Sequence, residues 1–192
     1  MMYKILKNVE EINLLKYFCT VAIDGCGGAG KSTLAEYMAS KHGGAQIIHI
    51  DDFYKPSCKR VSGRMCDKKV AADYDIKRLN EHVIGPIISG KEAKYQRYDW
   101  VLDDLSEWHT VQPKGLIIFE GVYSISDELY SKYDIKIFVE CNRKLRLKRG
   151  LERDGESALD FWQQWMSGED KYLHEQKPQD RADFIILGEE KY

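Results

Sequence analysis

The sequence predicts an α/β domain with a parallel sheet of about five strands and helices on both faces. Short apolar runs rich in β-branched residues alternate along the chain with longer segments whose apolar residues recur at helical spacing. This alternation is typical of right-handed βαβ crossovers, which build parallel sheets covered on both sides. With 192 residues, 43% hydrophobic and 31% charged, the chain suits one domain spanning residues 1 to 192.

The first predicted elements are a surface helix and a strand. Residues 8 to 16 place Val9 and Ile12 at helical spacing, and Val21 to Ile23 is a run of β-branched and small apolar residues. The strand is expected to end at Asp24, where the apolar run stops. This segment leads directly into the most informative motif of the chain.

That motif is GxxxxGK[ST], which is typical of a phosphate-binding loop and assigns the sheet to the P-loop NTPase type. Glycines let successive backbone N–H groups turn around a phosphate chain, and the following helix offers its positive end. We expect Lys31 to reach the β- and γ-phosphates of a nucleotide and Ser32 to hold Mg²⁺. The predicted nucleotide-binding residues are Gly25, Gly27, Gly28, Ala29, Gly30, Lys31, Ser32 and Thr33.

The remaining elements follow from the same two periodicities. Further strands are expected at Gln46 to Ile50, Leu116 to Phe119, Ile135 to Val139 and Phe184 to Leu187. Further helices are expected after the loop up to Gly43, at Tyr74 to Ile88, at Arg143 to Arg153 and at residues 157 to 175. Residues 93 to 112, rich in aromatic and β-branched residues, predict a small hairpin outside the main sheet, within an insertion at about 56 to 112.

Carboxylates stand at the ends of two predicted strands. Because parallel strands present their carboxyl ends at one edge of the sheet, Asp51, Asp52 and Glu120 are expected near the phosphate loop. An isolated Asp pair would commonly lie in a solvated turn, but beside a phosphate loop it is a candidate for chemistry. Glu120 has the position of an acid that helps to place Mg²⁺ or its water, with helix capping as the alternative.

A cationic helix is expected near residues 143 to 156. Arg146, Arg149 and Arg153 share one of its faces at helical spacing, so this helix is not simply a solvated surface. Nucleic-acid binding is one interpretation of such a face, and the formal net charge of −2 disfavours it.

The composition also bears on the compartment. The first residues lack the apolar core of a signal peptide, and we find no apolar run long enough to span a bilayer, so a cytoplasmic protein without a membrane partner is expected. Five cysteines without a CxxC pair indicate a reducing compartment. Cys26 lies beside a helix N-terminus, where a thiol can have a lowered pKa, but a small filler role in the loop is the favoured interpretation.

Four motifs in order, GCGGAGKST, IDDFYKP, IIFEG and RLKRGLERD, resemble the uridine kinase and phosphoribulokinase group of P-loop kinases. That group includes nicotinamide riboside kinases and bacterial pantothenate kinases, and the resemblance covers most of the chain. The runs YQRYDW, EGVYS and WxxWMxxED are similar to those of bacterial uridine kinase-like proteins. The resemblance implies ATP- and Mg²⁺-dependent transfer to a hydroxyl of a small metabolite, most simply a nucleoside or riboside.

The resemblance also implies residue roles. Asp51 matches the base for the acceptor hydroxyl, with Asp52 as a neighbour acting through the metal, so that Ser32, Asp52 and Glu120 form the metal side. Lys31 and the arginines of the cationic helix complete the catalytic set, and the resemblance implies that this helix, at about 143 to 156, closes over the triphosphate as a lid. The acceptor residues implied are Asp52, Tyr54, Tyr74, Asp75, Tyr98 and Trp100. One departure is Asp103, which stands where uridine kinases commonly have a histidine, and this puts uracil recognition in doubt.

Several alternatives stay open at this point. The acceptor could be pantothenate or a sugar phosphate, and a homodimer is one of the assemblies that the sequence leaves undecided. A non-catalytic nucleotide-binding module is a different class, which Asp51 argues against. A GTPase-like switch is disfavoured by the lack of an NKxD motif, and a motor ATPase by the short chain.

Overall fold

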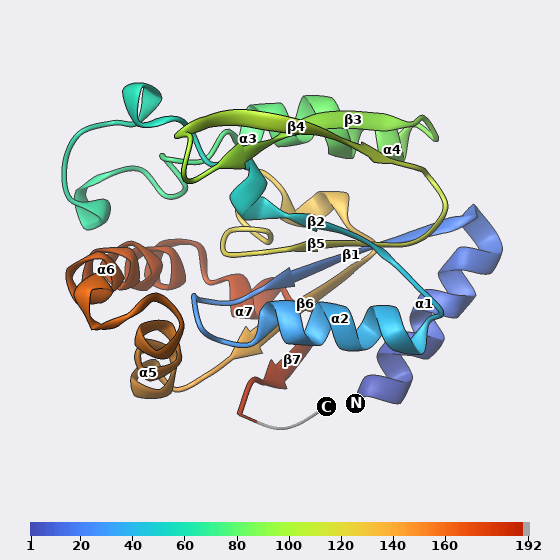
Figure 1. Cartoon of the computed structure of the whole chain (residues 1–192). Helices are drawn as coiled ribbons and strands as arrows, with labels where there is room; N and C mark the ends of the chain where they lie inside the picture. Colours follow the sequence, from blue (N-terminus) through green and yellow to red (C-terminus); the bar gives the residue numbers. More distant parts are fainter. Residues whose placement is uncertain (190–192) are drawn as a thin grey trace.

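A five-stranded sheet with the order β2-β5-β1-β6-β7 forms the centre of the computed structural model, which describes residues 1–189. Every neighbouring pair in this sheet is parallel, so all five carboxyl ends lie at one edge (Figure 1). The strands are β1 (Phe18–Asp24), β2 (Gln46–His49), β5 (Gly115–Glu120), β6 (Ile135–Glu140) and β7 (Phe184–Leu187). The predicted fold class is confirmed.

Helices cover both faces of the sheet (Figure 1). One face carries α1 (Met2–Lys16) and α2 (Lys31–Lys41), and the other carries a helix made of α3 (Ile76–Leu79), a π-helical turn at Asn80–Ile84 and α4 (Gly85–Ile88).

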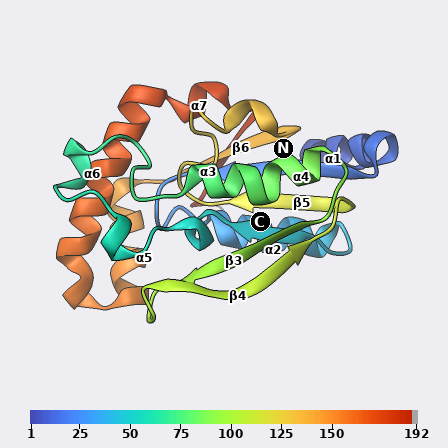
Figure 2. The same cartoon turned by 90° about the horizontal axis from the view of Figure 1, so that it is seen from above.

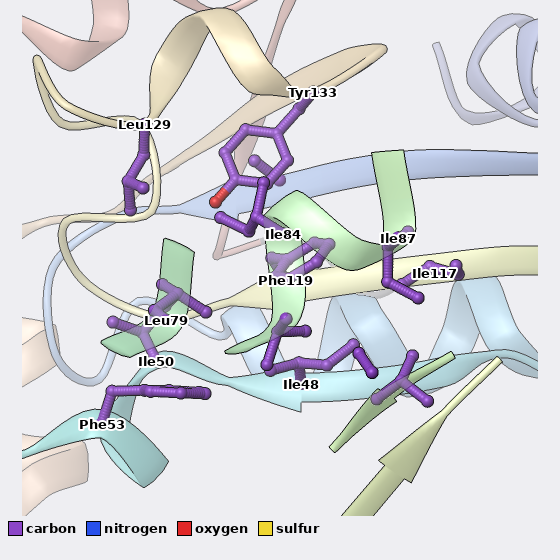
Figure 3. Close-up of a cluster of buried hydrophobic side chains, with 14 of the residues drawn as sticks. Ile48, Ile50, Phe53, Leu79, Ile84, Ile87, Ile117, Phe119, Leu129 and Tyr133 are labelled. Atoms are coloured by element: carbon purple, nitrogen blue, oxygen red, sulfur yellow. The ribbon is translucent and has the colours of Figure 1, made fainter. Parts of the chain in front are cut away.

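Alternation along β5 divides the core between the two faces. Leu116 and Ile118 pack on the side of α1 and α2, whereas Ile117 and Phe119 pack on the side of α3 and α4. Figure 3 shows the second cluster, in which Phe119 lies among side chains from β2, α3 and the segment after β5.

A two-stranded hairpin lies outside the main sheet, as predicted. Its antiparallel strands are β3 (Ala93–Asp99) and β4 (Asp104–Val111), with a bulge between Gln96 and Tyr98. In Figure 1 the turn of the hairpin points toward the carboxyl edge of the sheet. The hairpin therefore brings its tip to the end of the molecule where the phosphate loop lies.

Three C-terminal helices precede β7: α5 (Arg143–Asp154), α6 (Leu159–Gln176) and α7 (Pro178–Arg181). Figure 2 shows α5 and α6 together at one end of the molecule, beyond the carboxyl edge of the sheet. The loop after β2 reaches the same end, where the Lys171 ammonium group of α6 donates a hydrogen bond of 2.6 Å to the Lys68 carbonyl.

Two predicted boundaries were wrong. The first helix begins at Met2 instead of residue 8, because Ile5 is buried under it together with Val9. The second strand ends at His49, and Ile50–Phe53 turns into a 3₁₀-helix. Because a 3₁₀-helix has three residues per turn, neighbouring side chains on it point in different directions.

One fully buried carboxylate, Asp24, ties the carboxyl edge together. Its Oδ1 accepts the Gly25 N–H at 2.6 Å, and its Oδ2 accepts the Ile125 N–H at 2.7 Å and the Tyr172 hydroxyl at 2.6 Å. Asp24 thus joins the phosphate loop, the segment after β5 and α6. Burial raises the pKa of Asp24 to about 6, and these hydrogen bonds oppose the rise.

The raised pKa of Asp24 predicts a pH-dependent stability. Since the folded state binds this proton more tightly than the unfolded chain, whose Asp pKa is 3.8, the favourable contribution is complete below pH 3.8 and is lost as the pH rises through about 6. The unfolding free energy of the wild type relative to Asp24→Asn, measured in urea, is expected to increase as the pH falls from ~7 to ~4. A difference that does not change across this range would contradict the assignment.

Candidate functional site

A cavity of about 640 Å³ opens at the carboxyl edge of the sheet. Its walls come from the phosphate loop, the 3₁₀-helix after β2, the end of β5, the hairpin turn, α5 and α6. The predicted site residues that line it are Gly27, Gly28, Gly30, Lys31, Ser32, Thr33, Asp51, Tyr54, Tyr74, Trp100, Glu120, Arg149 and Arg153. The predicted residues outside its lining are Gly25, Ala29, Asp52, Asp75, Tyr98 and Arg146.

The phosphate loop has the backbone shape that its glycines predict. Gly28 and Gly30 have φ values of +74° and +101°, which side-chain-bearing residues rarely adopt. Lys31 begins α2, and its ammonium group donates a hydrogen bond to the Cys26 carbonyl at 3.1 Å. The loop and this ammonium group therefore frame a positive, anion-binding end of α2.

The Cys26 thiol is buried inside this loop. Burial raises its pKa, and Glu169 adds to the rise. The thiol therefore does not have the lowered pKa that its place beside a helix N-terminus allows, because loss of water outweighs the nearby cations. Its burial agrees with the interpretation that the sequence favours, a small filler in the loop.

Ser32 and Glu120, which are expected to hold Mg²⁺, meet in the cavity. The Ser32 hydroxyl donates to Glu120 Oε1 at 3.2 Å, and His49 Nδ1 lies 2.6 Å from the same oxygen. Burial alone would raise the pKa of Glu120, but His49 and Lys31 lower it, so this carboxylate stays ionised at neutral pH. The contact of His49 with Glu120 was not predicted, because a polar residue at the end of a short strand is commonly a solvent-facing one.

Asp51, the expected base, also lines the cavity. Its Oδ1 accepts the Tyr74 hydroxyl at 3.0 Å, and the side chain is exposed toward the cavity. The surrounding protein raises the pKa of Asp51, while Lys31 opposes the rise.

Three predicted acceptor residues lie elsewhere. Asp52 is buried and accepts the Tyr95 hydroxyl at 2.9 Å, because neighbouring side chains on the 3₁₀-turn point in different directions. Asp75 caps the N-terminus of α3. Tyr98 is 1% exposed, and its hydroxyl donates to Asp103 at 2.7 Å. None of the three lines the cavity, contrary to the expectation for acceptor residues; the Tyr98 ring packs against Tyr54 and Trp100, with centroid separations of 5.7 and 5.1 Å.

Six aromatic rings line the cavity as a continuous wall. Each ring contacts the next, with centroid separations of 5.3, 5.0, 4.6, 6.4 and 5.9 Å along the series. In order, this aromatic wall consists of Tyr123, Tyr74, Tyr54, Trp100, Trp165 and Trp162. From the sequence alone, the helical spacing of Trp162 and Trp165 favours core packing, with shaping of the acceptor pocket as the second interpretation, because spacing does not distinguish a core face from a cavity face.

The arginines of α5 divide into two groups. Arg149 and Arg153 line the cavity, and Arg149 Nη1 donates to the carbonyls of Gly28 at 3.3 Å and Gly188 at 2.9 Å. Arg146 is buried and pairs with Glu169 at 2.7 Å. The prediction that all three share one exposed phosphate-facing surface therefore needs correction for Arg146, whose partner lies on α6.

Comparison with known proteins identifies the family. The chain matches the phosphoribulokinase / uridine kinase family over residues 20–188. It belongs to this family. A uridine kinase of Halobacterium salinarum is 30% identical over 86% of this chain and 78% of its own length, and a nicotinamide riboside kinase of Saccharomyces cerevisiae is 25% identical over 88% and 80%. The protein is thus a small-molecule kinase, and the predicted resemblance is confirmed.

Solved structures agree on the fold of this kinase. The structure of a possible uridine kinase from Bacillus stearothermophilus matches with a TM-score of 0.70 at 19% identity, covering 95% of this chain and 99% of that one.

The closeness of α5 to the phosphate loop predicts a contrast between two glycines. A Cβ at Gly28 would lie 2.5 Å from the Arg146 carbonyl oxygen, whereas a Cβ at Gly43 would meet no atom within 4 Å. The two have similar φ values of +74° and +78°, so backbone strain is matched. Gly28→Ala is expected to lower the unfolding free energy by at least about 2 kcal/mol more than Gly43→Ala in urea melts. Equal losses would show that α5 does not press on the loop.

Proposed function

We propose that this kinase transfers the γ-phosphoryl group of ATP, with Mg²⁺, to a hydroxyl of a nucleoside or riboside. The single observation that carries the proposal is that the phosphate loop, Asp51 and the aromatic wall open into one cavity. Such a cavity places a phosphate donor, a base and a surface for a planar group within reach of one another.

The donor half of the cavity suits a nucleotide and its metal. Within residues 1–189, no three His, Cys, Asp or Glu side chains come together as a metal site. Ser32 and Glu120 alone would fit Mg²⁺, which is typically held by one or two protein oxygens together with water and substrate phosphates. Mg²⁺ would neutralise phosphate charge there, while Lys31, the loop amides and Arg149 hold the phosphates.

The acceptor half supports Asp51 as the base. Phosphoryl transfer needs a carboxylate that orients the acceptor hydroxyl and accepts its proton. Asp51 is exposed in the cavity, and its bond to Tyr74 fixes one carboxylate oxygen. The raised pKa makes this carboxylate a better proton acceptor than an ordinary Asp.

The aromatic wall supports an acceptor that carries a flat ring. Base-on-aromatic stacking contributes about 1–3 kcal/mol per base and depends little on base identity. Within this wall the Trp100 and Tyr54 rings are tilted by 30° to each other, with centroids 4.6 Å apart, and both line the cavity. The names of the two relatives, a uridine kinase and a nicotinamide riboside kinase, support the same acceptor class. Asp103, which replaces the expected histidine, is hydrogen-bonded to Tyr98 and does not line the cavity, so no uracil-specific contact is proposed there.

The remaining expectations stay part of this proposal. The partners are ATP and a small acceptor rather than a nucleic acid or a membrane, the compartment is the cytoplasm, and a homodimer is an open possibility. Within residues 1–189, no helix has the length and apolar character needed to cross a bilayer.

An ADP-release assay with Mg-ATP tests the proposal. The panel contains nucleosides, nicotinamide riboside, pantothenate and sugar phosphates, each at the same concentration. Turnover is expected with one or more ribosides, because the aromatic wall stacks their rings. Turnover confined to pantothenate or a sugar phosphate would replace the acceptor class. ATP binding without turnover on any compound would favour a non-catalytic module.

Asp51→Asn tests the base. ATP affinity is expected to stay near the wild-type value, while kcat falls about 10²- to 10⁴-fold, because the amide cannot accept the proton. Initial rates and a separate ATP titration measure the two quantities. Asp52→Asn is the matched comparison, since Asp52 lies outside the cavity lining. If Asp51→Asn kept its turnover and Asp52→Asn lost it, the base would be Asp52.

A further inference from the structure

A carboxylate of the protein itself occupies the phosphate loop. Glu169 Oε1 accepts the Gly27 N–H at 2.6 Å, and Glu169 Oε2 accepts from Arg146 Nη1 at 2.7 Å. Glu169 and Arg146 are each 4% exposed. Both oxygens of this carboxylate are therefore used on groups of the kind that bind phosphate, a loop amide and a guanidinium.

Two other cations near the loop have carbonyl oxygens as their hydrogen-bond partners. Lys31 donates to the carbonyl of Cys26, and Arg149 donates to the carbonyls of Gly28 and Gly188. A carbonyl oxygen carries no net charge, so these contacts do not neutralise the two side chains. Arg153 pairs with the Asp154 carboxylate at 2.7 Å, but its side chain is largely exposed. Arg146 is thus the buried arginine whose charge a carboxylate neutralises beside the loop.

We propose that Glu169 is an internal anion that holds the place of a nucleotide phosphate, and that ATP displaces it from Gly27 and Arg146. This inference rests on the proposed use of ATP. Glu169 also lines the cavity, so the displaced carboxylate turns toward solvent there. Arg146 then exchanges one anion for another and is never left buried without a partner, which would be costly.

This exchange gives α5 and α6 a role in sensing the nucleotide. Arg146 lies on α5 and Glu169 on α6, and their ion pair fastens both helices to the loop before the nucleotide arrives. When ATP binds, its phosphates take the place of the Glu169 carboxylate in contacting Gly27 and Arg146. AMP, which lacks the β- and γ-phosphates, offers less charge for the exchange.

Glu169→Gln tests the exchange, because glutamine keeps the length of the side chain and removes its charge. The Kd for Mg-ATP is expected to fall about fivefold or more, and the Kd for AMP to change less. Trp162 and Trp165 lie on the same helix as Glu169, so tryptophan fluorescence can follow the titration. Asp170→Asn is the matched control: its carboxylate is next in α6, pairs with the exposed Arg143 at 3.0 Å, and should leave the Kd for ATP unchanged.

A purely structural role for Glu169 predicts the opposite sign. The loop would loosen, and the Kd for ATP in Glu169→Gln would stay equal or rise. If Glu169→Gln gave that result while the wild type phosphorylated its acceptor, the inference would be overturned and the proposed function would stand. If Glu169→Gln bound ATP more tightly but the wild type phosphorylated no acceptor, the inference would stand and the proposed function would be overturned. A wild type that binds no ATP would contradict both.

Thermal melts keep the test decisive if Glu169→Gln is poorly folded. Because ATP supplies the missing anion for Arg146, the rise in Tm on adding saturating Mg-ATP is expected to be larger in Glu169→Gln than in the wild type. Glu169→Asp has a side chain one methylene shorter, which moves the carboxylate away from Arg146, so its Tm is also expected to rise more with Mg-ATP than that of the wild type. Variants that stay unfolded despite saturating Mg-ATP would contradict the exchange.

Discussion

The buried carboxylate of Asp24 holds the carboxyl edge of the central strand together. It accepts hydrogen bonds from Gly25, Ile125 and Tyr172, which belong to three different segments. A buried carboxylate is stable only while its hydrogen bonds are made, so these segments hold their positions together. Because the parallel strands all end at this edge, one anchor positions the phosphate loop, the end of β5 and α6 around the same cavity.

The cavity beside Asp24 is lined by both cationic side chains and carboxylates. Lys31 and Arg149 contact carbonyl oxygens, whereas Asp51 accepts a hydrogen bond from Tyr74 of the aromatic wall. The surrounding protein raises the pKa of Asp51 while Lys31 limits the rise. In the function that we propose, the two cations would bind the phosphates and Asp51 would accept the proton, so that donor and acceptor meet in one cavity.

The sequence predicted those features whose cause is local. Alternation, glycine placement and strand ends predicted the sheet, the loop and the neighbourhood of Asp51 and Glu120. The predictions from sequence were wrong where the direction of a side chain depends on a distant partner or on a turn of the backbone. Asp52 follows a 3₁₀-turn instead of the strand, and Arg146 meets Glu169, which is 23 residues further along the chain. Helical spacing does not show whether Trp165 faces the core or a cavity, because apolar residues are found in both places.

A crystal structure with a non-hydrolysable Mg-ATP analogue and the riboside that the assay identifies tests the proposed function most directly. The analogue's phosphates are expected on the loop beside Lys31, and the acceptor hydroxyl about 2.6–3.2 Å from the Asp51 carboxylate, directed at the γ-phosphorus. An acceptor hydroxyl bound away from Asp51, or a ring that does not contact the aromatic wall, would contradict the proposed function.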